Sequence, residues 1–360
     1  MKIEVYDSFE RLPPTLASLC TCSVQDNWFH SLEWMQCLYR TVLASTVTPH
    51  IYVVLDDTGA AVGCLFCCVR QDDRRELCSM TTYYALAFAP VFRAGADIRG
   101  VSEALAQHIA SERPRWHTLR WDTLDLSHAG TAALIDALAR HGFAITRHHQ
   151  YENWYVDIGG VTFAQYFEKR PSRMRNTVER KSKKLAKTHQ TKIVVVQQEG
   201  PELESAMADW VAIYNSSWKQ PEPYPEFMPE HARTCARLGL LRLGVLYVDG
   251  TPAAAQFWIT LRGLACIYKL AYDERFSDWS VGSILSHHLF RHAIDIDGIA
   301  VADYGVGSEP YKKDWMDSMR QLEGMRAYSM RTLRGATRIL DEKLRQRAKR
   351  FVRRAPAAAS

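Results

Sequence analysis

The stretch "IYKLAYDERFSDWSVGSIL", from Ile267 to Leu285, decides how this chain is interpreted. A strand is expected to end near Asp273, and a helix is expected to begin near Gly282 and Ser283 after a short loop. The first backbone N–H groups of a helix have no acceptor within the helix, and the helix dipole makes that end partly positive. The stretch therefore predicts a strand, a loop and a helix start that can bind an anion such as a phosphate.

The anion cradle is expected at the turn that opens this helix. The lack of a side chain at Gly282 would let a ligand approach the backbone closely. The residues expected to supply the amides are Ser280, Val281, Gly282 and Ser283. An ordinary helix start is the alternative, because many helices begin with residues of this kind.

The elements around this stretch are expected to occur in the same order twice. In the second half, helices are expected at 202–218 and 283–296, and strands at 241–250, 251–261, 264–273 and 298–305. In the first half, helices are expected at 27–43, 101–111 and 131–142, and strands at 50–56, 61–71, 116–124 and 152–158. Alternating helices and strands indicate an α/β (α+β) fold, here with two mixed β-sheets flanked by helices.

The charged residues divide the chain further. Residues 1–160 and 193–325 carry net charges of −5 and −7, whereas 161–192 and 326–360 carry +8 and +9. We expect a first domain at 1–160, a basic helical connector at 161–192, a second domain at 193–330 and a basic helix or tail at 331–360. The basic segments are either solvated helix faces or surfaces for an anionic partner.

Composition limits the class of protein. No run of eighteen apolar residues and no apolar signal-peptide region occur in the sequence, so a cytoplasmic protein is expected. The nine cysteines are irregularly spaced, which argues against a disulfide framework. Cys64 and Cys67 form a C-x-x-C in an apolar run, but a zinc site would need a second such pair. No metal is therefore expected.

A second stretch, "VADYGVGSEPYKKDWMD", runs from Val301 to Asp317. It places an acid, two tyrosines and two lysines just after an apolar strand. These groups either serve a reaction or have structural roles, with Asp303 capping a turn, Tyr311 and Trp315 packed and the lysines solvated.

With the basic lead-in "FAQYFEKRPSRMRNTVERKSKKL" at 163–185, these stretches resemble the tandem acyltransferases of the GNAT superfamily. The chain is most similar to the BioF-like/CelD acetyltransferase domain, a relative of the FemABX peptidyltransferases, over roughly Phe163 to Arg331. The first half is similar only as a weaker GNAT-like repeat. The chain departs from this pattern in having Ser-Val-Gly at 280–282, where relatives often have Ser-Pro-Gly.

The resemblance implies transfer of an acyl or acetyl group from acyl-coenzyme A or acetyl-coenzyme A to an amine. It also implies that the donor pyrophosphate rests on the helix start at 280–283. Such a reaction needs a base for the attacking amine and donors for the oxyanion. The residues expected to catalyse it are Asp303 or Glu309 as base, Tyr311 as proton donor to the thiolate, and Lys312 at the carbonyl oxygen or a phosphate. The family's frequent link to exopolysaccharide and envelope synthesis suggests a glycan or peptide precursor as acceptor.

Four residues are expected to line the substrate site: Trp218, Lys269, Tyr272 and Tyr304. Tyr304 is also a candidate proton donor to the leaving thiolate. Lys269 and Tyr272 lie three positions apart in one strand, so they are expected on opposite faces. The aromatic run at 81–88 is expected either to fill the core beside a strand or to line an acceptor groove.

Two other functions remain open at this point. A Fem-type transferase would use aminoacyl-tRNA, and the basic helix at 169–187 would contact RNA phosphates. A non-catalytic scaffold would bind an anionic membrane or nucleic acid through the basic segments.

The tail also has two interpretations. Between 337 and 352, the helical spacing places four apolar residues broadly along one side: Ile339, Leu340, Leu344 and Phe351. Such a basic amphipathic helix could lie on an anionic membrane surface, or it could pack on the second domain.

Overall fold

The computed structural model describes residues 1–21 and 27–354, so residues 22–26, which include Cys22, and residues 355–360 lie outside the described residues. The elements up to the first connecting strand are β1 (Lys2–Tyr6), α1 (Pro14–Thr21), η1 (Trp28–His30), α2 (Leu32–Leu38), η2 (Tyr39–Leu43), β2 (Val47–Leu55), β3 (Ala61–Arg70), β4 (Glu76–Ser79), β5 (Val91–Phe92), α3 (Ile98–Ser111), β6 (Thr118–Leu124), α4 (Ala129–Arg140) and β7 (Phe143–Asp157).

The remaining elements are α5 (Phe163–Glu168), α6 (Ser172–Thr188), β8 (Thr191–Val196), α7 (Pro201–Asn215), α8 (Phe227–Arg237), β9 (Leu241–Val248), β10 (Thr251–Leu261), β11 (Leu264–Tyr272), η3 (Glu274–Trp279), α9 (Val281–Asp295), β12 (Val301–Val306), α10 (Lys312–Trp315), β13 (Ser318–Ser329) and α11 (Leu333–Arg354). Below, the first half means the elements before β7, and the second half means those from α5 to α10. The long strands β7 and β13 are called the connecting strands.

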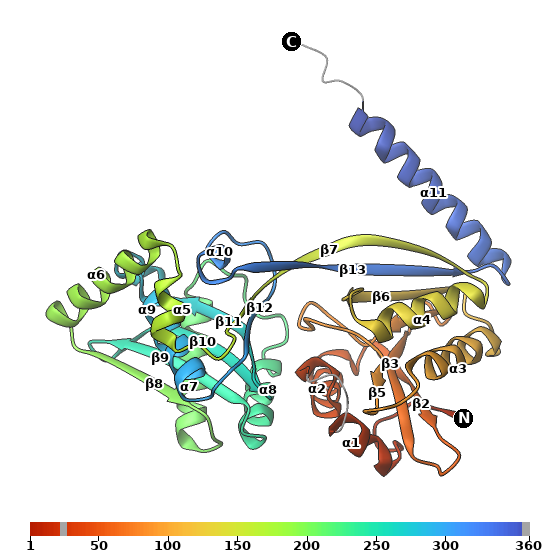
Figure 1. Cartoon of the computed structure of the whole chain (residues 1–360), viewed down its shortest axis with the longest axis horizontal. Helices are drawn as coiled ribbons and strands as arrows, with labels where there is room; N and C mark the ends of the chain where they lie inside the picture. The colour runs from red at the N-terminus through yellow and green to blue at the C-terminus, as the bar shows by residue number, and fades with distance from the viewer. Residues whose placement is uncertain (22–26, 355–360) are drawn as a thin grey trace.

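The α/β fold is confirmed, but the two expected sheets are joined into one. Over the described residues, the strands are hydrogen-bonded in the order β1-β2-β3-β4-β6-β13-β7-β12-β11-β10-β9-β8, with β5 paired to β3. The cause is the pair of connecting strands, which run antiparallel to each other between the two bodies (Figure 1). β13 also pairs with β6 and β7 pairs with β12, so each connecting strand extends one half.

Three hydrophobic clusters stabilise this arrangement. Two lie on the outer faces of the sheet, where α3 and α4 cover the first half and α5, α6 and α9 cover the second. The third is shared, because it combines buried residues of the first 91 positions with residues of α7, α8 and β9 to β11. The two halves therefore fold against one common core.

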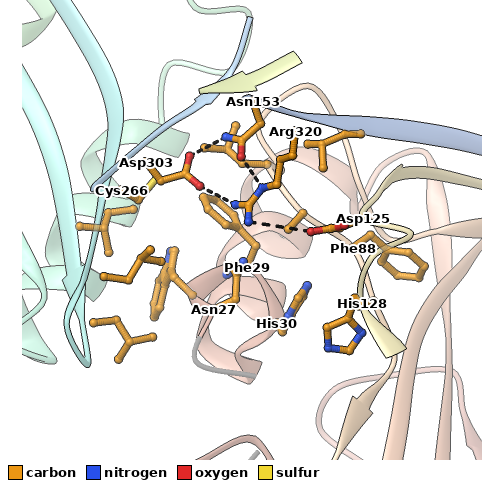
Figure 2. Close-up of a pocket in the computed structure, with 18 residues that line it drawn as sticks. Asn27, Phe29, His30, Phe88, Asp125, His128, Asn153, Cys266, Asp303 and Arg320 are labelled. Atoms are coloured by element: carbon orange, nitrogen blue, oxygen red, sulfur yellow. Dashed lines mark hydrogen bonds and ion pairs between the residues drawn. The ribbon is translucent and has the colours of Figure 1, made fainter. Parts of the chain in front are cut away.

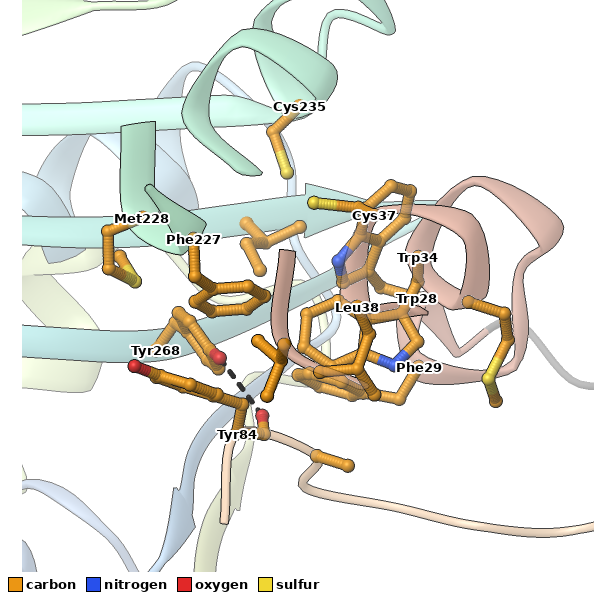
Figure 3. Packing of buried hydrophobic residues seen from close by; sticks show 14 of the residues in the cluster. Trp28, Phe29, Trp34, Cys37, Leu38, Tyr84, Phe227, Met228, Cys235 and Tyr268 are labelled. Atoms are coloured by element: carbon orange, nitrogen blue, oxygen red, sulfur yellow. Dashed lines mark hydrogen bonds between the residues drawn. The ribbon is translucent and has the colours of Figure 1, made fainter. Parts of the chain in front are cut away.

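Aromatic side chains from both halves meet in this shared cluster (Figure 3). Trp34 of α2 packs edge-on against Phe227 of α8 and against Tyr268 of β11. Trp28 Nε1 donates a hydrogen bond of 2.9 Å to Nε2 of His231. Burial lowers the pKa of His231 to about 3, so its ring is neutral and able to accept this bond. These contacts fix the first half against the second.

The C-terminal helix α11 projects away from the two bodies (Figure 1). Arg338 bonds to Asp73 and Thr118, so the helix is anchored on the first half rather than on the second domain. Ile339 is buried, whereas Leu340 and Leu344 are exposed, so the expected single apolar side is divided between protein and solvent. The side chain of Phe351 lies outside the described residues.

The C-x-x-C run forms part of β3. Cys64, Cys67 and Cys68 are all buried there, and burial raises the pKa of each thiol. Protonated, buried thiols of this kind pack as small apolar groups.

Candidate functional site

The second half contains two parallel strands that separate. β11 and β12 are paired from Leu264–Val301 to Cys266–Asp303, yet β11 continues to Tyr272 and β12 continues to Val306. Backbone N–H and C=O groups along such a gap are available to a ligand that lies between the strands.

Gly305 explains why β12 turns away. Its φ is +61°, a left-handed conformation that favours glycine, and the pairing of β12 with β7 is irregular between Asp303 and Val306. A Cβ on Gly305 would lie 2.5 Å from Cδ1 of Leu86, which comes from the first half. The bend therefore depends on a residue without a side chain and on close packing of the two halves.

The predicted cradle lies at the open end of this gap. α9 begins at Val281, and Ser280 before it has φ 55° and ψ 38°. No described side chain caps this helix start, so its first N–H groups remain available. Tyr272 lies against Gly282, since a Cβ there would be 3.4 Å from the ring. The end of β11 and the start of α9 thus form one surface.

Basic residues of α6 lie beside the cradle. Lys181 Nζ donates to the backbone oxygen of Asp278, and Lys184 Nζ lies 5.1 Å from the ring centre of Trp279. Both contacts hold α6 against η3, the turn that leads into α9. The connector therefore adds positive charge where an anionic ligand would enter.

Two of the predicted substrate residues meet at this end. The rings of Trp218 and Tyr272 have centroids 4.7 Å apart, and Trp218 is half exposed. Lys219 lies next to them, and burial lowers its pKa to about 8, with the charge of Lys269 as a second cause. Lys219 therefore loses its proton near pH 8, which is close to physiological pH.

Lys269 belongs to a polar cluster on the shared-core side of the sheet. Its ammonium pairs with Glu222, which also accepts a 2.6 Å hydrogen bond from the hydroxyl of Tyr84. Tyr84 belongs to the aromatic run at 81–88, and its backbone oxygen accepts a bond of 2.9 Å from Tyr268. The first half therefore supplies a wall of the second-half site. Sequence reasoning missed Glu222, because a lone acid in a Pro-rich loop carries no pattern.

The turn after β12 is held from two sides. Lys312 is buried, and its Nζ donates to the oxygen of Val306 at 2.7 Å and pairs with Glu309 at 2.9 Å. Burial of Glu309 would raise its pKa, but the hydrogen bond and charge of Lys312 outweigh burial and keep that pKa below its ordinary value. Glu309 is therefore ionised at neutral pH, and its carboxylate is half exposed.

Asp303 anchors the other side of the same turn. Its Oδ1 accepts bonds of 2.6 Å from Asn153 and from the N–H of Gly305, and its Oδ2 accepts a 2.6 Å bond from Arg320 (Figure 2). All three donors belong to groups around the turn, and Asp303 is only 7% exposed. The structure therefore places Asp303 as a support of the bend, while Glu309 is the more accessible acid.

The two tyrosines of the second stretch lie together on the α9 side of the sheet. The ring centroids of Tyr304 and Tyr311 are 5.7 Å apart. Burial raises the pKa of both phenols, so both stay protonated and can donate a hydrogen bond. The hydroxyl of Tyr304 is buried and has no hydrogen-bond partner within the described residues.

Neither a metal-binding cluster nor a membrane-spanning helix occurs among the described residues. No group of three His, Cys, Asp or Glu side chains in this part of the chain is placed to hold a metal ion. No helix within the same residues is long and apolar enough to cross a membrane.

Comparisons with known proteins agree with this geometry. The family model described as an acetyltransferase (GNAT) domain matches residues 172–313, which run from α6 to α10. No curated protein matches the sequence. Among solved structures, FemX is 10% identical with a TM-score of 0.60, covering 90% of this chain and 97% of FemX.

Two further structures are similar to almost the whole chain. A conserved protein of unknown function from Bacteroides thetaiotaomicron is 13% identical with a TM-score of 0.59, covering 91% of this chain and 100% of that one. The C-terminal domain of a putative lysylphosphatidylglycerol synthetase from Agrobacterium fabrum is 12% identical with a TM-score of 0.54, covering 91% and 96%.

The separated strand pair and the uncapped helix start thus lie within the residues that match the acetyltransferase (GNAT) domain. The fold of the whole chain is similar to that of FemX and of the lysylphosphatidylglycerol synthetase domain, and the GNAT resemblance predicted from the sequence is confirmed over residues 172–313.

Proposed function

We propose that the protein is an acyltransferase that moves an acyl group from acyl-coenzyme A to an amine. The observation that carries the proposal is the uncapped start of α9 at the open end of the gap between β11 and β12. The helix start suits the pyrophosphate, and the gap suits the extended arm of the donor, which can bond to free strand groups. Donor binding would then place the thioester near Tyr304 and Gly305.

The residues around the gap suit the chemical steps. The amine nitrogen attacks the thioester carbonyl, a C–N bond forms, the C–S bond breaks, and the amine loses a proton. Glu309 takes that proton through water, with Lys219 as a neighbour whose proton is lost near pH 8. Tyr311 or Tyr304 donates to the leaving sulfur. Lys312 holds the turn rather than the carbonyl oxygen, because its ammonium is already bonded to Val306 and Glu309.

Calorimetric titration with coenzyme A tests the donor site directly. Gly282→Trp should abolish binding, because the new side chain fills the cradle beside Tyr272. Ala208→Trp, at an exposed position of α7, serves as a surface control for the same new side chain. Equal affinity in wild type and a folded Gly282→Trp protein would rule out this cradle.

A second candidate function is transfer from aminoacyl-tRNA. The observation in its favour is the basic face of α6, which lies against the turn that leads into the cradle. Filter binding with tRNA over a salt series tests it, since RNA contacts through lysines weaken steeply with salt. Binding of tRNA without any binding of coenzyme A would favour this function over the first.

We infer a cytoplasmic enzyme of the BioF-like/CelD group that acts on an envelope or exopolysaccharide precursor. Its domain boundaries lie at 160/161, 192/193 and 330/331.

Leu340 and Leu344 on α11 are exposed among basic residues, which supports a peripheral contact with an anionic membrane. Removal of residues after Gly335 should then abolish sedimentation with anionic liposomes. A protein that binds such liposomes but neither coenzyme A nor tRNA would instead be a scaffold.

A further inference from the structure

A cavity of about 270 Å³ lies between the two halves, on the shared-core side of the sheet. Its lining includes His30, Phe88 and Asp125 from the first half, Cys266 and Asp303 from the second, and Arg320 from β13 (Figure 2). Cys266 and Asp303 form the last paired rung before β11 and β12 separate. A molecule in the cavity would therefore lie against the place where the proposed acyl group arrives.

His30 is the most informative residue of this cavity. It belongs to η1 and is 7% exposed, and neither ring nitrogen has a hydrogen-bond partner among the described residues. Burial lowers the pKa of His30 to about 3, with the neighbouring His128 as a second cause, so the ring is neutral. A neutral imidazole has one N–H donor and one nitrogen acceptor. A hydroxyl group, which both donates and accepts, matches this pair.

The other end of the cavity is acidic. Arg320 is committed to Asp303 and to Asn153, whose Oδ1 accepts from its Nε at 2.5 Å. Asp125 lies 3.9 Å from Arg320 Nη1, which is too far for a hydrogen bond. Two carboxylates thus share one guanidinium, and this end carries a net charge of −1. It favours a cation, and it disfavours a phosphate or carboxylate.

The walls between these ends are apolar. Phe29, Leu86, Phe88 and Leu322 line the cavity with other hydrophobic side chains. The volume lies below the roughly 300–1,000 Å³ that is typical of pockets for drug-sized ligands. The ligand is therefore small, with a body that packs on aromatic rings and polar groups at its two ends.

We propose that this cavity is the acceptor site and that it takes a small amine that also carries hydroxyl groups. The amino group lies at the Asp125–Arg320–Asp303 end, beside the separating strands, and a hydroxyl bonds to His30. This assignment of the acceptor class rests on the proposed acyltransferase function, whereas binding of the amine itself does not. The geometry adds His30 and Asp125 as specificity residues.

Calorimetry on the full chain, without coenzyme A, tests the site with three probes: glucosamine, glucose and cyclohexylamine. Glucosamine carries both an amino group and hydroxyl groups, so it should bind most tightly. Glucose lacks the amino group, and cyclohexylamine lacks the hydroxyl groups. His30→Phe keeps a ring of similar size and should weaken glucosamine binding at least tenfold. Asp125→Asn should weaken glucosamine but leave the weaker glucose binding unchanged.

His287→Phe is the matched control, because His287 is a half-buried histidine of α9 that packs on Phe163, away from the cavity. If His30→Phe does not fold, the imidazole signals of His30 in the wild-type NMR spectrum should shift on addition of glucosamine. Equal glucosamine affinity in wild type and His30→Phe overturns the proposal, and so does the lack of binding by all three probes at millimolar concentration.

The outcomes separate the two proposals. Glucosamine binding that depends on His30, without any binding of coenzyme A, supports the cavity and contradicts the donor assignment. Coenzyme A binding and transfer to an amine lacking hydroxyls, with His30→Phe as active as wild type, supports the donor assignment and contradicts the acceptor class.

Discussion

The two halves have the same strand pair, but only the second half leaves it open. In the first half, β4 and β6 are paired from Glu76–Thr118 to Cys78–Arg120. Beyond that point, Phe88 forms a parallel bridge to Leu124, and its N–H donates to the oxygen of Thr123 at 3.0 Å. The position that is open between β11 and β12 is therefore filled in the first half by the chain itself.

The helix that connects the two strands of each pair shows the same difference. Asp97 caps α3 with its side chain, which accepts from the N–H of Gly100, and so a negative charge already lies at that helix start. Ser280 makes no such bond at the start of α9 in the described structure. The two halves thus share one topology, but only the helix start of the second half is suited to an anionic donor, whereas the first half fills its own strand gap.

The closed half still contributes to the proposed site. The segment that fills its own strand gap also carries Tyr84 and Leu86, which contact Tyr268 and Gly305 of the second half. The half whose strand gap is filled therefore supplies a wall for the gap of the other half.

Local signals in the sequence predicted the secondary structure around the candidate site better than they predicted the long-range arrangement. The strand, loop and helix start between Ile267 and Leu285 could be predicted, because the turn residues and the apolar pattern are adjacent in the chain. The joined sheet could not be predicted. β7 begins at Phe143 rather than near residue 152, and nothing in its sequence indicates that it pairs with both β12 and β13.

The same limit explains the site residues that were missed. The helix expected at 202–218 ends at Asn215, so Lys219, which follows the predicted residue Trp218, lies in a loop whose path depends on contacts with distant residues. His30 lies in no recognisable sequence motif, and only its burial between the halves marks it as a candidate for ligand binding.

The largest expected effect comes from replacing Gly305, at the bend of β12, with threonine, the residue that has a similar backbone conformation in the first half. Thr123 has a φ of 58°, close to the 61° of Gly305, but a threonine at 305 would bring a Cβ within 2.5 Å of Leu86 Cδ1. Gly305→Thr should lower the acyl-transfer rate by roughly 10²-fold or more, because the strand gap and the reacting atoms shift. It should also lower the free energy of unfolding by about 2 kcal/mol.

Steady-state kinetics and chemical denaturation measure the two effects. Gly305→Ala combined with Leu86→Ala relieves the clash and should recover part of the rate. A folded Gly305→Thr protein with the wild-type rate would show that the gap does not depend on this bend.

A smaller effect is expected from an acidic cap at the start of α9, like the Asp97 cap at the start of α3. Ser280→Asp places a carboxylate at the start of α9, and an aspartate tolerates the left-handed backbone there. The Kd for coenzyme A should rise about tenfold or more, since the carboxylate competes with the phosphates for the free N–H groups. Ser280→Asn has the same shape without the charge and should change the Kd much less, as titration calorimetry can measure. Equal Kd values for the two variants would place the phosphates elsewhere.

The contact between the halves should respond to acid. The pKa of His231 is about 3 in the folded protein and about 6.5 in the unfolded chain. Between these values the unfolded chain binds the proton and the folded protein does not, so stability is lost as the pH falls below about 6.5. At pH 5 the loss from this residue is about 2 kcal/mol.

Urea denaturation from pH 7 to pH 4 measures this dependence. His231→Gln keeps an acceptor for Trp28 but does not titrate, so its stability should fall less steeply over this range. Parallel curves for the two proteins would show that His231 does not contribute to the acid sensitivity.

The smallest effect tests the closed half directly. Asp97→Ala removes the cap of α3 and leaves the Gly100 N–H without the acceptor that the Asp97 side chain now provides. The free energy of unfolding should fall by about 1 kcal/mol, as is typical for the loss of an N-cap. The affinity for coenzyme A should stay unchanged, because Phe88 still fills the gap between β4 and β6 and leaves no room for the donor arm. Thermal unfolding and a coenzyme A titration measure both quantities on one sample. A second coenzyme A bound per chain in Asp97→Ala would show that the cap, and not the filled gap, is what closes the first half.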